Sequence, residues 1–112
     1  MSIRGAVVGL VFLTTLGGCA GTTRIGTILD DPSRFDGRTV RVDGEVTESF
    51  GLPVVGGAYR ISDGSGTLTV VSEGGGVPRQ GAEVRVEGTF WSVFQLGNAS
   101  LSVIQERDRS VR

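Results

Sequence analysis

The sequence contains no histidine and no lysine, and Cys19 is its only cysteine. A single cysteine cannot form a disulfide within the chain, and the missing imidazoles remove the commonest transition-metal ligand and the commonest general base. All 11 cationic side chains are arginines, against 12 acidic ones, so the formal net charge is −1. This balance gives no general attraction to nucleic acid or to anionic lipid. Helix-forming runs are rare and glycine is abundant, which favours strands and turns.

The acidic residues form no catalytic or metal-binding pattern. Asp30, Asp31 and Asp36 are the candidates for a paired-carboxylate mechanism, but they flank a proline turn, where aspartate normally caps or turns the backbone. Residues 63–66 lack the spaced acids and closing glutamate of a calcium loop and are typical of a hairpin turn. Residues 74–76 are followed by no Lys-Ser/Thr pair, which argues against a phosphate loop. We therefore predict a non-enzymatic protein with no catalytic residue, no metal and no cofactor.

Residues 1–18 have the pattern of an export signal. A short, positively charged start precedes an apolar stretch that is well short of the roughly 20 residues needed to span a bilayer. The stretch ends in Leu16-Gly17-Gly18-Cys19, which resembles the lipobox of bacterial lipoproteins. The resemblance implies cleavage before Cys19, a diacylglycerol thioether on its sulfur and acylation of its new amine, with fatty acids such as palmitate. Two other interpretations are an ordinary signal peptide cut after Ala20 and a buried core helix.

Lipidation predicts attachment to a membrane. Several acyl chains, each contributing about 0.8 kcal/mol per buried CH₂, make a practically permanent anchor. Residues 19–24 then form a tether that reaches roughly 20 Å at ~3.5 Å per residue, so the domain is expected close to the membrane. In enterobacterial lipoproteins an Asp after the lipidated cysteine resembles an inner-membrane retention signal, whereas this sequence has Ala20. We predict an exported protein, on the periplasmic face of the outer membrane if the organism is Gram-negative.

Residues 25–106 are predicted to form one small all-β domain, followed by a charged tail over residues 107–112. Ile25–Asp31 is predicted as one short helical segment that Pro32 stops, with a turn to Gly37. Alternating apolar and polar residues mark five strands, namely those containing Val40, Val42 and Val46; Tyr59 and Ile61; Leu68 and Val70; Val84, Val86 and Phe90; and Leu101 and Val103. Gly44 indicates a bulge or a sharp coil in the first strand.

Two segments of the domain nearly repeat each other. Residues 37–44 and residues 81–88 each begin with a turn glycine, continue through alternating valines with arginine between them, and end in an acid and a second glycine. Two copies are too few for a solenoid. They are typical of two strands with similar places in one curved sheet. If these strands pair antiparallel, each outward arginine is expected beside an outward acid of its partner.

Five short strands with glycine kinks in the first and fourth resemble the OB fold, a small Greek-key barrel. The alternating run from Tyr59 to Val70, with its turn at residues 63–66, is similar to the hairpin of the second and third strands in OB domains, including the exported bacterial OB-fold (BOF) family. The entry Asp31–Arg38 resembles the same domains. Many OB domains carry a helix between the third and fourth strands, but the glycines and Pro78 leave little room for one here. The segment Ile25–Asp31 is expected to plug that barrel end instead.

The resemblance implies binding through the second and third strands and the loops that join strands one to two and four to five. Large apolar residues occur in both expected loops, at residues 50–55 and 91–94, where polar residues are usual. The candidate binding residues are Phe50, Leu52, Val54, Tyr59, Arg60, Trp91 and Phe94. The alternative is that several of them fold back to close the barrel.

Three kinds of binding remain open from the sequence. We predict a membrane-anchored, non-enzymatic adaptor that binds an envelope protein or peptide. The alternative is a binder of small ligands or oligosaccharides at the barrel mouth. Binding of single-stranded nucleic acid is the weaker hypothesis, because its stacking aromatics need a cationic groove and the cations here are balanced by acids.

Overall fold

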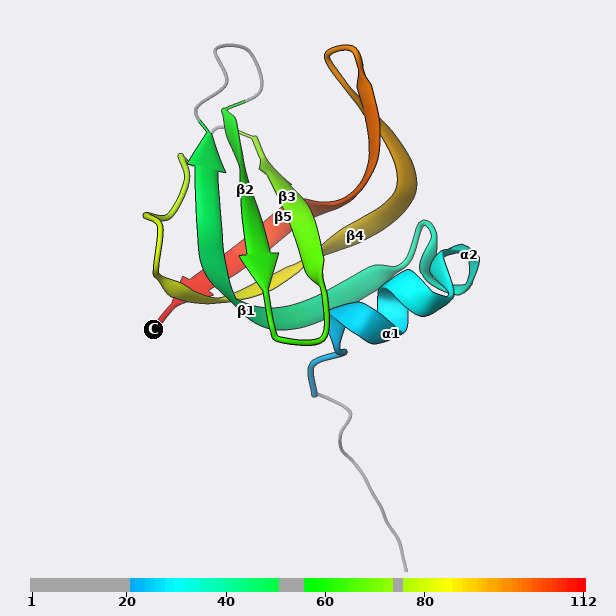
Figure 1. The fold of residues 1–112 in the computed structure, drawn as a ribbon, viewed down its shortest axis with the longest axis horizontal. Coiled ribbons are helices and arrows are strands. Elements are labelled where there is room, and N and C mark those ends of the chain that lie inside the picture. Colours follow the sequence, from blue (N-terminus) through cyan, green and yellow to red (C-terminus); the bar gives the residue numbers. More distant parts are fainter. Residues whose placement is uncertain (1–20, 51–55, 74–75) are drawn as a thin grey trace, which may run out of the picture.

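The computed structural model describes residues 21–50, 56–73 and 76–112, which form two short helices and five strands. Figure 1 shows the strands wrapped into a barrel with both helices beside one end. In chain order the elements are α1 (Ile25–Asp30), α2 (Pro32–Phe35), β1 (Thr39–Phe50), β2 (Gly57–Ser62), β3 (Thr67–Ser72), β4 (Glu83–Leu96) and β5 (Ala99–Val111).

The sheet closes on itself in the order β1-β2-β3-β5-β4, and β4 pairs back with β1. All neighbouring strands are antiparallel except β3 and β5, which are parallel. The predicted five-stranded all-β barrel is therefore confirmed. The two repeated segments become the antiparallel neighbours β1 and β4, in which Arg41 lies opposite Glu87 and Asp43 lies opposite Arg85. The expected pairing of arginine with acid is confirmed as well.

The core lies inside the barrel and is built from alternate residues of every strand. Val42, Val86 and Phe90 are fully buried, and the predicted inward-facing valines surround them. Ile25 and Ile28 of α1 belong to the same cluster. Residues 25–31 therefore close one barrel end, as expected, although the helix itself stops at Asp30. Each such side chain contributes about 1.5–3 kcal/mol when fully removed from water.

Hydrogen bonds from the β2–β3 turn hold α1 on the barrel. The carboxylate of Asp63 accepts the backbone N–H of Ile25 at 2.9 Å, and Ser65 Oγ accepts that of Gly26 at 2.9 Å. The other oxygen of Asp63 accepts the N–H groups of Ser65 and Gly66 inside the turn. Because the first N–H groups of a helix have no partner within the helix, the turn caps α1 through tertiary contacts. Burial alone raises the pKa of Asp63, but these hydrogen bonds prevail and lower it.

Three local expectations were wrong. Residues 32–35, expected in a turn, form the helix α2, because proline is well suited to the first helical position. Of the bulge or sharp coil expected at Gly44, the bulge is not found there, because the β1–β4 ladder runs unbroken through Gly44 and the register shift of β1 lies between Val46 and Glu48. Residues 107–111, expected in a charged tail, are the last part of β5, where Val111 pairs with Val84. The helix α2 thus has a local cause in its proline, whereas the end of β5 is a strand because β4 pairs with it.

Gly88 marks the tightest approach between strands. A β-carbon added there would collide with the carbonyl oxygen of Gln105 on β5, next to a register shift between Glu87 and Gly88. Its counterpart Gly44 is less crowded, because an added β-carbon would lie 3.0 Å from the carbonyl oxygen of Ser62. The two glycines of the repeat thus allow neighbouring backbones to come close.

Candidate binding face

The predicted loop residues are placed mainly on strands. Phe50 ends β1 and is 38% exposed, and Arg60 is an exposed residue of β2. Trp91 and Phe94 lie within β4, which runs on to Leu96, so the expected loop at residues 91–94 is wrong. The long alternation of β4 includes this segment, and the sequence signal for a strand was therefore present. Leu52 and Val54 lie outside the described residues.

Tyr59 does not belong to a surface site, because its side chain is fully buried. Its hydroxyl donates a hydrogen bond to the carboxylate of Glu106, which also accepts bonds from Ser72 Oγ at 3.3 Å and Arg109 Nη1 at 3.2 Å. The Arg109 guanidinium lies 5.6 Å from the centre of the tyrosine ring. Burial, reinforced by Glu106, raises the pKa of Tyr59, so the phenol stays protonated. This polar cluster links side chains of β2, β3 and β5 by hydrogen bonds inside the barrel.

The strand registers place the other candidates on the outer face of one continuous sheet. Tyr59, Val70 and Ile104 belong to the core cluster, so their neighbours along each strand point to the opposite face. Two rows of cross-strand partners cross that face. The first runs through Glu48, Arg60, Thr69, Val103 and Trp91, and the second runs through Phe50, Ala58, Val71, Gln105 and Thr89. Phe50, Arg60 and Trp91 therefore share one face.

The same face continues along the β4–β5 hairpin beyond the barrel. Phe94 pairs with Leu101, and Leu96 pairs with Ala99. Alternation along β5 puts Leu101 on the side of Val103, so all four residues extend the outer face. Phe94, Leu96 and Leu101 are half-buried. We call this surface, from Phe50 and Arg60 across to Trp91 and the hairpin, the outer sheet face.

The centre of the outer sheet face is an apolar layer that the sequence analysis missed. Ala58, Val71 and Val103 are nearly or fully buried, yet they are not part of the core cluster inside the barrel. Thr69, between them in the first row, is also buried. The sequence of β3 does indicate this layer. Residues 68–71 read Leu-Thr-Val-Val without a charged side chain, which is typical of a strand that is buried on both faces.

Polar bonds fix the side chains at the edge of this layer. The indole N–H of Trp91 donates to Gln105 Oε1 at 3.0 Å, and Gln105 Nε2 donates to Glu73 Oε2 at 3.0 Å. Because the single N–H donor of the indole is hydrogen-bonded, the orientation of the Trp91 ring on this face is fixed. At the other end of the row, Arg60 donates to Glu48 Oε1 at 2.6 Å. The charge of Arg60 is therefore balanced locally.

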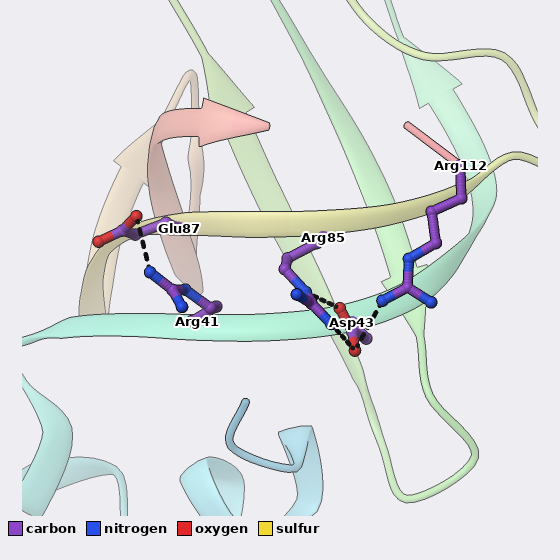
Figure 2. A network of polar contacts seen from close by, with 5 residues as sticks. All are labelled: Arg41, Asp43, Arg85, Glu87 and Arg112. Carbon is purple, nitrogen blue, oxygen red and sulfur yellow. Dashed lines mark hydrogen bonds and ion pairs between the residues drawn. The ribbon is translucent and has the colours of Figure 1, made fainter. Parts of the chain in front are cut away.

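A second polar strip lies on the outside of β1 and β4 (Figure 2). Arg85 makes two bonds to the carboxylate of Asp43, at 2.8 and 3.2 Å, and Arg112 adds a third at 3.3 Å. Arg41 lies 3.5 Å from Glu87. The hydrogen bond from Arg85 holds the pKa of Asp43 below its usual value. Because its three arginines alternate with two acids, the strip lacks the single sign of charge that would attract an ionic ligand.

Two kinds of feature are absent from the part of the chain that the structure describes. Within residues 21–50, 56–73 and 76–112, no three acidic side chains come together in a way that could hold a metal ion. In the same ranges no helix has the length and apolar character needed to cross a bilayer.

Comparisons with known proteins give a fold but no family. No family model and no curated protein matches the sequence. Among solved structures, the barrel is similar to part of a chain described as an aspartyl-tRNA synthetase from Leishmania major Friedlin, with a TM-score of 0.60 and 19% identity. The fold is OB-like. The match covers 81% of this chain and 21% of that chain, so the OB-like barrel corresponds to about one fifth of the larger protein.

Proposed function

We propose that this chain is an exported, lipid-anchored protein without catalytic activity, and that its OB-like barrel binds an envelope protein or peptide through the outer sheet face. The observation that carries the proposal is the group of partly exposed aromatic side chains on that face, Phe50, Trp91 and Phe94, which border its buried apolar layer. Large aromatic side chains next to a desolvated apolar surface are the anchors that supply most of the energy in protein interfaces.

Charge favours a protein partner over nucleic acid. Affinity for nucleic acid depends on cations that neutralise phosphates. On the outer sheet face Arg60 is already paired with Glu48, and the full sequence is formally acidic by one charge. The similarity to a tRNA synthetase extends to the fold alone and carries no ligand with it.

Binding of a small ligand inside the barrel mouth has less support. Ile25 and Ile28 fill the end beside the β2–β3 turn. Towards the other end, Tyr59, Glu106 and Arg109 bond to one another. The chain's own side chains therefore occupy the positions in which a ligand would lie.

The first described residues support a domain held close to its anchor. The backbone N–H of Thr23 donates to the carbonyl of Arg41 on β1 at 2.8 Å. Thr23 follows Cys19 by four residues, a span of at most ~14 Å at ~3.5 Å per residue. A lipid on Cys19 would thus keep α1 and the adjacent β2–β3 turn near the membrane, and Figure 1 shows the tip of the β4–β5 hairpin at the opposite end of the barrel.

The test is capture of a partner from detergent-solubilised envelope by the full, lipidated chain. We expect one partner to be retained by the wild type and lost with the pair Phe50→Ser and Phe94→Ser, because both remove apolar contacts from the outer sheet face. Val111→Ser is the matched control, since Val111 is 58% exposed but lies at the far end of β5. Equal capture by all three proteins would overturn the assignment of the face.

Direct titrations separate the competing ligands. Trp91 is the only tryptophan and borders the face, so its emission reports on a ligand bound there. We expect the purified partner to change this emission. A saturable change with an oligosaccharide or a single-stranded oligonucleotide, and none with the partner, would replace the proposal by the corresponding binding function.

A further inference from the structure

The outer part of the β4–β5 hairpin has a strand edge without a strand partner among the described residues. β1 pairs with β4 as far as Thr89. Beyond it, the N–H of Gly37 donates to the carbonyl of Phe90, and the N–H of Phe90 donates to the carbonyl of Arg38. The next N–H on this edge, that of Ser92, is taken by the carboxylate of Asp36 at 2.8 Å. From Val93 to Leu96, β4 pairs only with β5. Figure 1 shows this part of the hairpin projecting beyond the barrel.

The exposed edge lacks the usual protection against pairing with another strand. Proteins commonly guard free edges with charged side chains or proline. From Trp91 to Gln105 no residue is charged and none is proline, although 21% of the chain is charged. Val93, on the edge strand, is 70% exposed. Asp36 protects the edge only as far as Ser92, so the backbone groups of β4 beyond Ser92 have no strand partner on this side among the described residues.

Alternation identifies which backbone groups face the open edge. Gly97 and Asn98 form a two-residue turn between Leu96 and Ala99, and such a turn is closed by a hydrogen-bonded pair. Leu96 and, two residues earlier, Phe94 therefore direct their backbone groups to β5. The N–H and C=O of Gln95 point the other way, to the open edge, because successive residues alternate.

From this geometry we infer that two copies of this chain pair antiparallel through the β4 edge, about a two-fold axis at Gln95. This axis is perpendicular to the sheet, so side chains that share a face in one copy share it with the second copy. Gln95 lies opposite Gln95 of the second copy. Phe94 of each copy lies opposite Leu96 of the other, and both pairs are on the apolar outer sheet face.

The absence of charge makes a second copy the fitting occupant. Around a two-fold axis a strand meets itself, and any charge near the axis would face its own kind, which is destabilising. Residues 92–97 carry no charge, so two copies can pair without repulsion between like charges. For the same reason they offer no charge that would select a charged foreign peptide. Pairing would also extend the outer sheet face across both copies. The inference goes beyond the proposed function, since it rests on the backbone edge and not on which partner the face binds.

Sedimentation of the fragment 21–112 tests the inference, because all five strands and the core cluster lie within it. Over a dilution series from millimolar to micromolar we expect a species of twice the monomer mass that dissociates on dilution. Gln95→Lys should abolish it, because like charges would then lie directly opposite each other at the axis, and Val111→Lys should not. A monomer throughout the series, or a dimer that survives Gln95→Lys, would overturn the inference.

A disulfide trap tests the register. The fragment 21–112 contains no cysteine, so Gln95→Cys introduces its only thiol. Hydrogen-bonded antiparallel partners have Cα atoms about 5.5 Å apart, within the range that a disulfide bridges. Mild oxidation should therefore link the Gln95→Cys variant into dimers rapidly. Ser100→Cys, the partner of Gln95 on β5, is the control, and equal cross-linking of both would contradict this register. Partner capture is measured separately, so either proposal can fail alone.

Discussion

Asp63 of the β2–β3 turn accepts a hydrogen bond from the backbone N–H of Ile25, 38 residues earlier in the chain. The bond joins the first residue of α1 to the tip of a hairpin and buries Ile25 in the barrel end. One carboxylate therefore determines both the shape of a turn and the position of the helix that closes the barrel.

The Asp63→Asn variant should be less stable at neutral pH by about 1–3 kcal/mol, because a charged acceptor of several N–H groups is lost. The pKa of Asp63 is lowered in the folded protein from its usual 3.8, so its contribution is complete above that value and is lost as the pH falls through the folded pKa. Urea unfolding at pH 7 and at about pH 3 measures the difference, which should shrink in acid. Asp30→Asn, at an exposed site on α1, is the control.

Gly88→Ala should destabilise the barrel by at least the upper part of the ~1–3 kcal/mol range of overpacked sites. The added methyl group meets the backbone carbonyl of Gln105, which cannot move without breaking the β4–β5 pairing. Gly44→Ala should cost less, since its neighbour lies at 3.0 Å. Thermal unfolding of the two variants beside Thr89→Ala gives the comparison. A Gly88 variant as stable as the Thr89 variant would show that the strands separate easily.

Val42→Ala and Val86→Ala should each reduce the free energy of unfolding by about 1–3 kcal/mol, through lost burial and a cavity. The two valines are cross-strand partners and fully buried, so the double variant is expected to depart from additivity. Arg41→Ala should cost much less, because its pair with Glu87 is partly exposed. Equal losses in all three single variants would contradict the assigned facing of β1.

Intact mass spectrometry of the mature protein should show diacylglycerol on Cys19 and no residues before it. The expectation comes from Leu16-Gly17-Gly18-Cys19 at the end of an apolar stretch. Cys19→Ser should abolish the lipid and leave the precursor uncut. A lipid-free species that begins at Gly21 would instead identify an ordinary signal peptide.

The sequence by itself determined the five strands and most of their residues that face the core. Valines at every second position with glycines at both ends predicted β1 and β4, and the Arg and acid positions predicted opposite charges side by side if these strands paired antiparallel, as they do. Side-chain alternation is a local property, and for that reason it can be read from one segment alone. Phe50, Arg60, Trp91 and Phe94 were selected as candidates by the resemblance to OB domains and by the apolar composition of the expected loops, although Trp91 and Phe94 lie in a strand.

Tertiary structure decided which face those residues share and where Tyr59 lies. Alternation shows that neighbouring side chains point to opposite faces of a strand, but it does not show whether both faces of that strand are buried. Only the closure of the sheet, with β5 between β3 and β4, brings Glu106 to the hydroxyl of Tyr59 and places Val103 beside Thr69 on the outer sheet face. The last residues of β5 likewise became a strand because β4 offers them a partner, and no local pattern encodes a partner that lies 20 or more residues away in the chain.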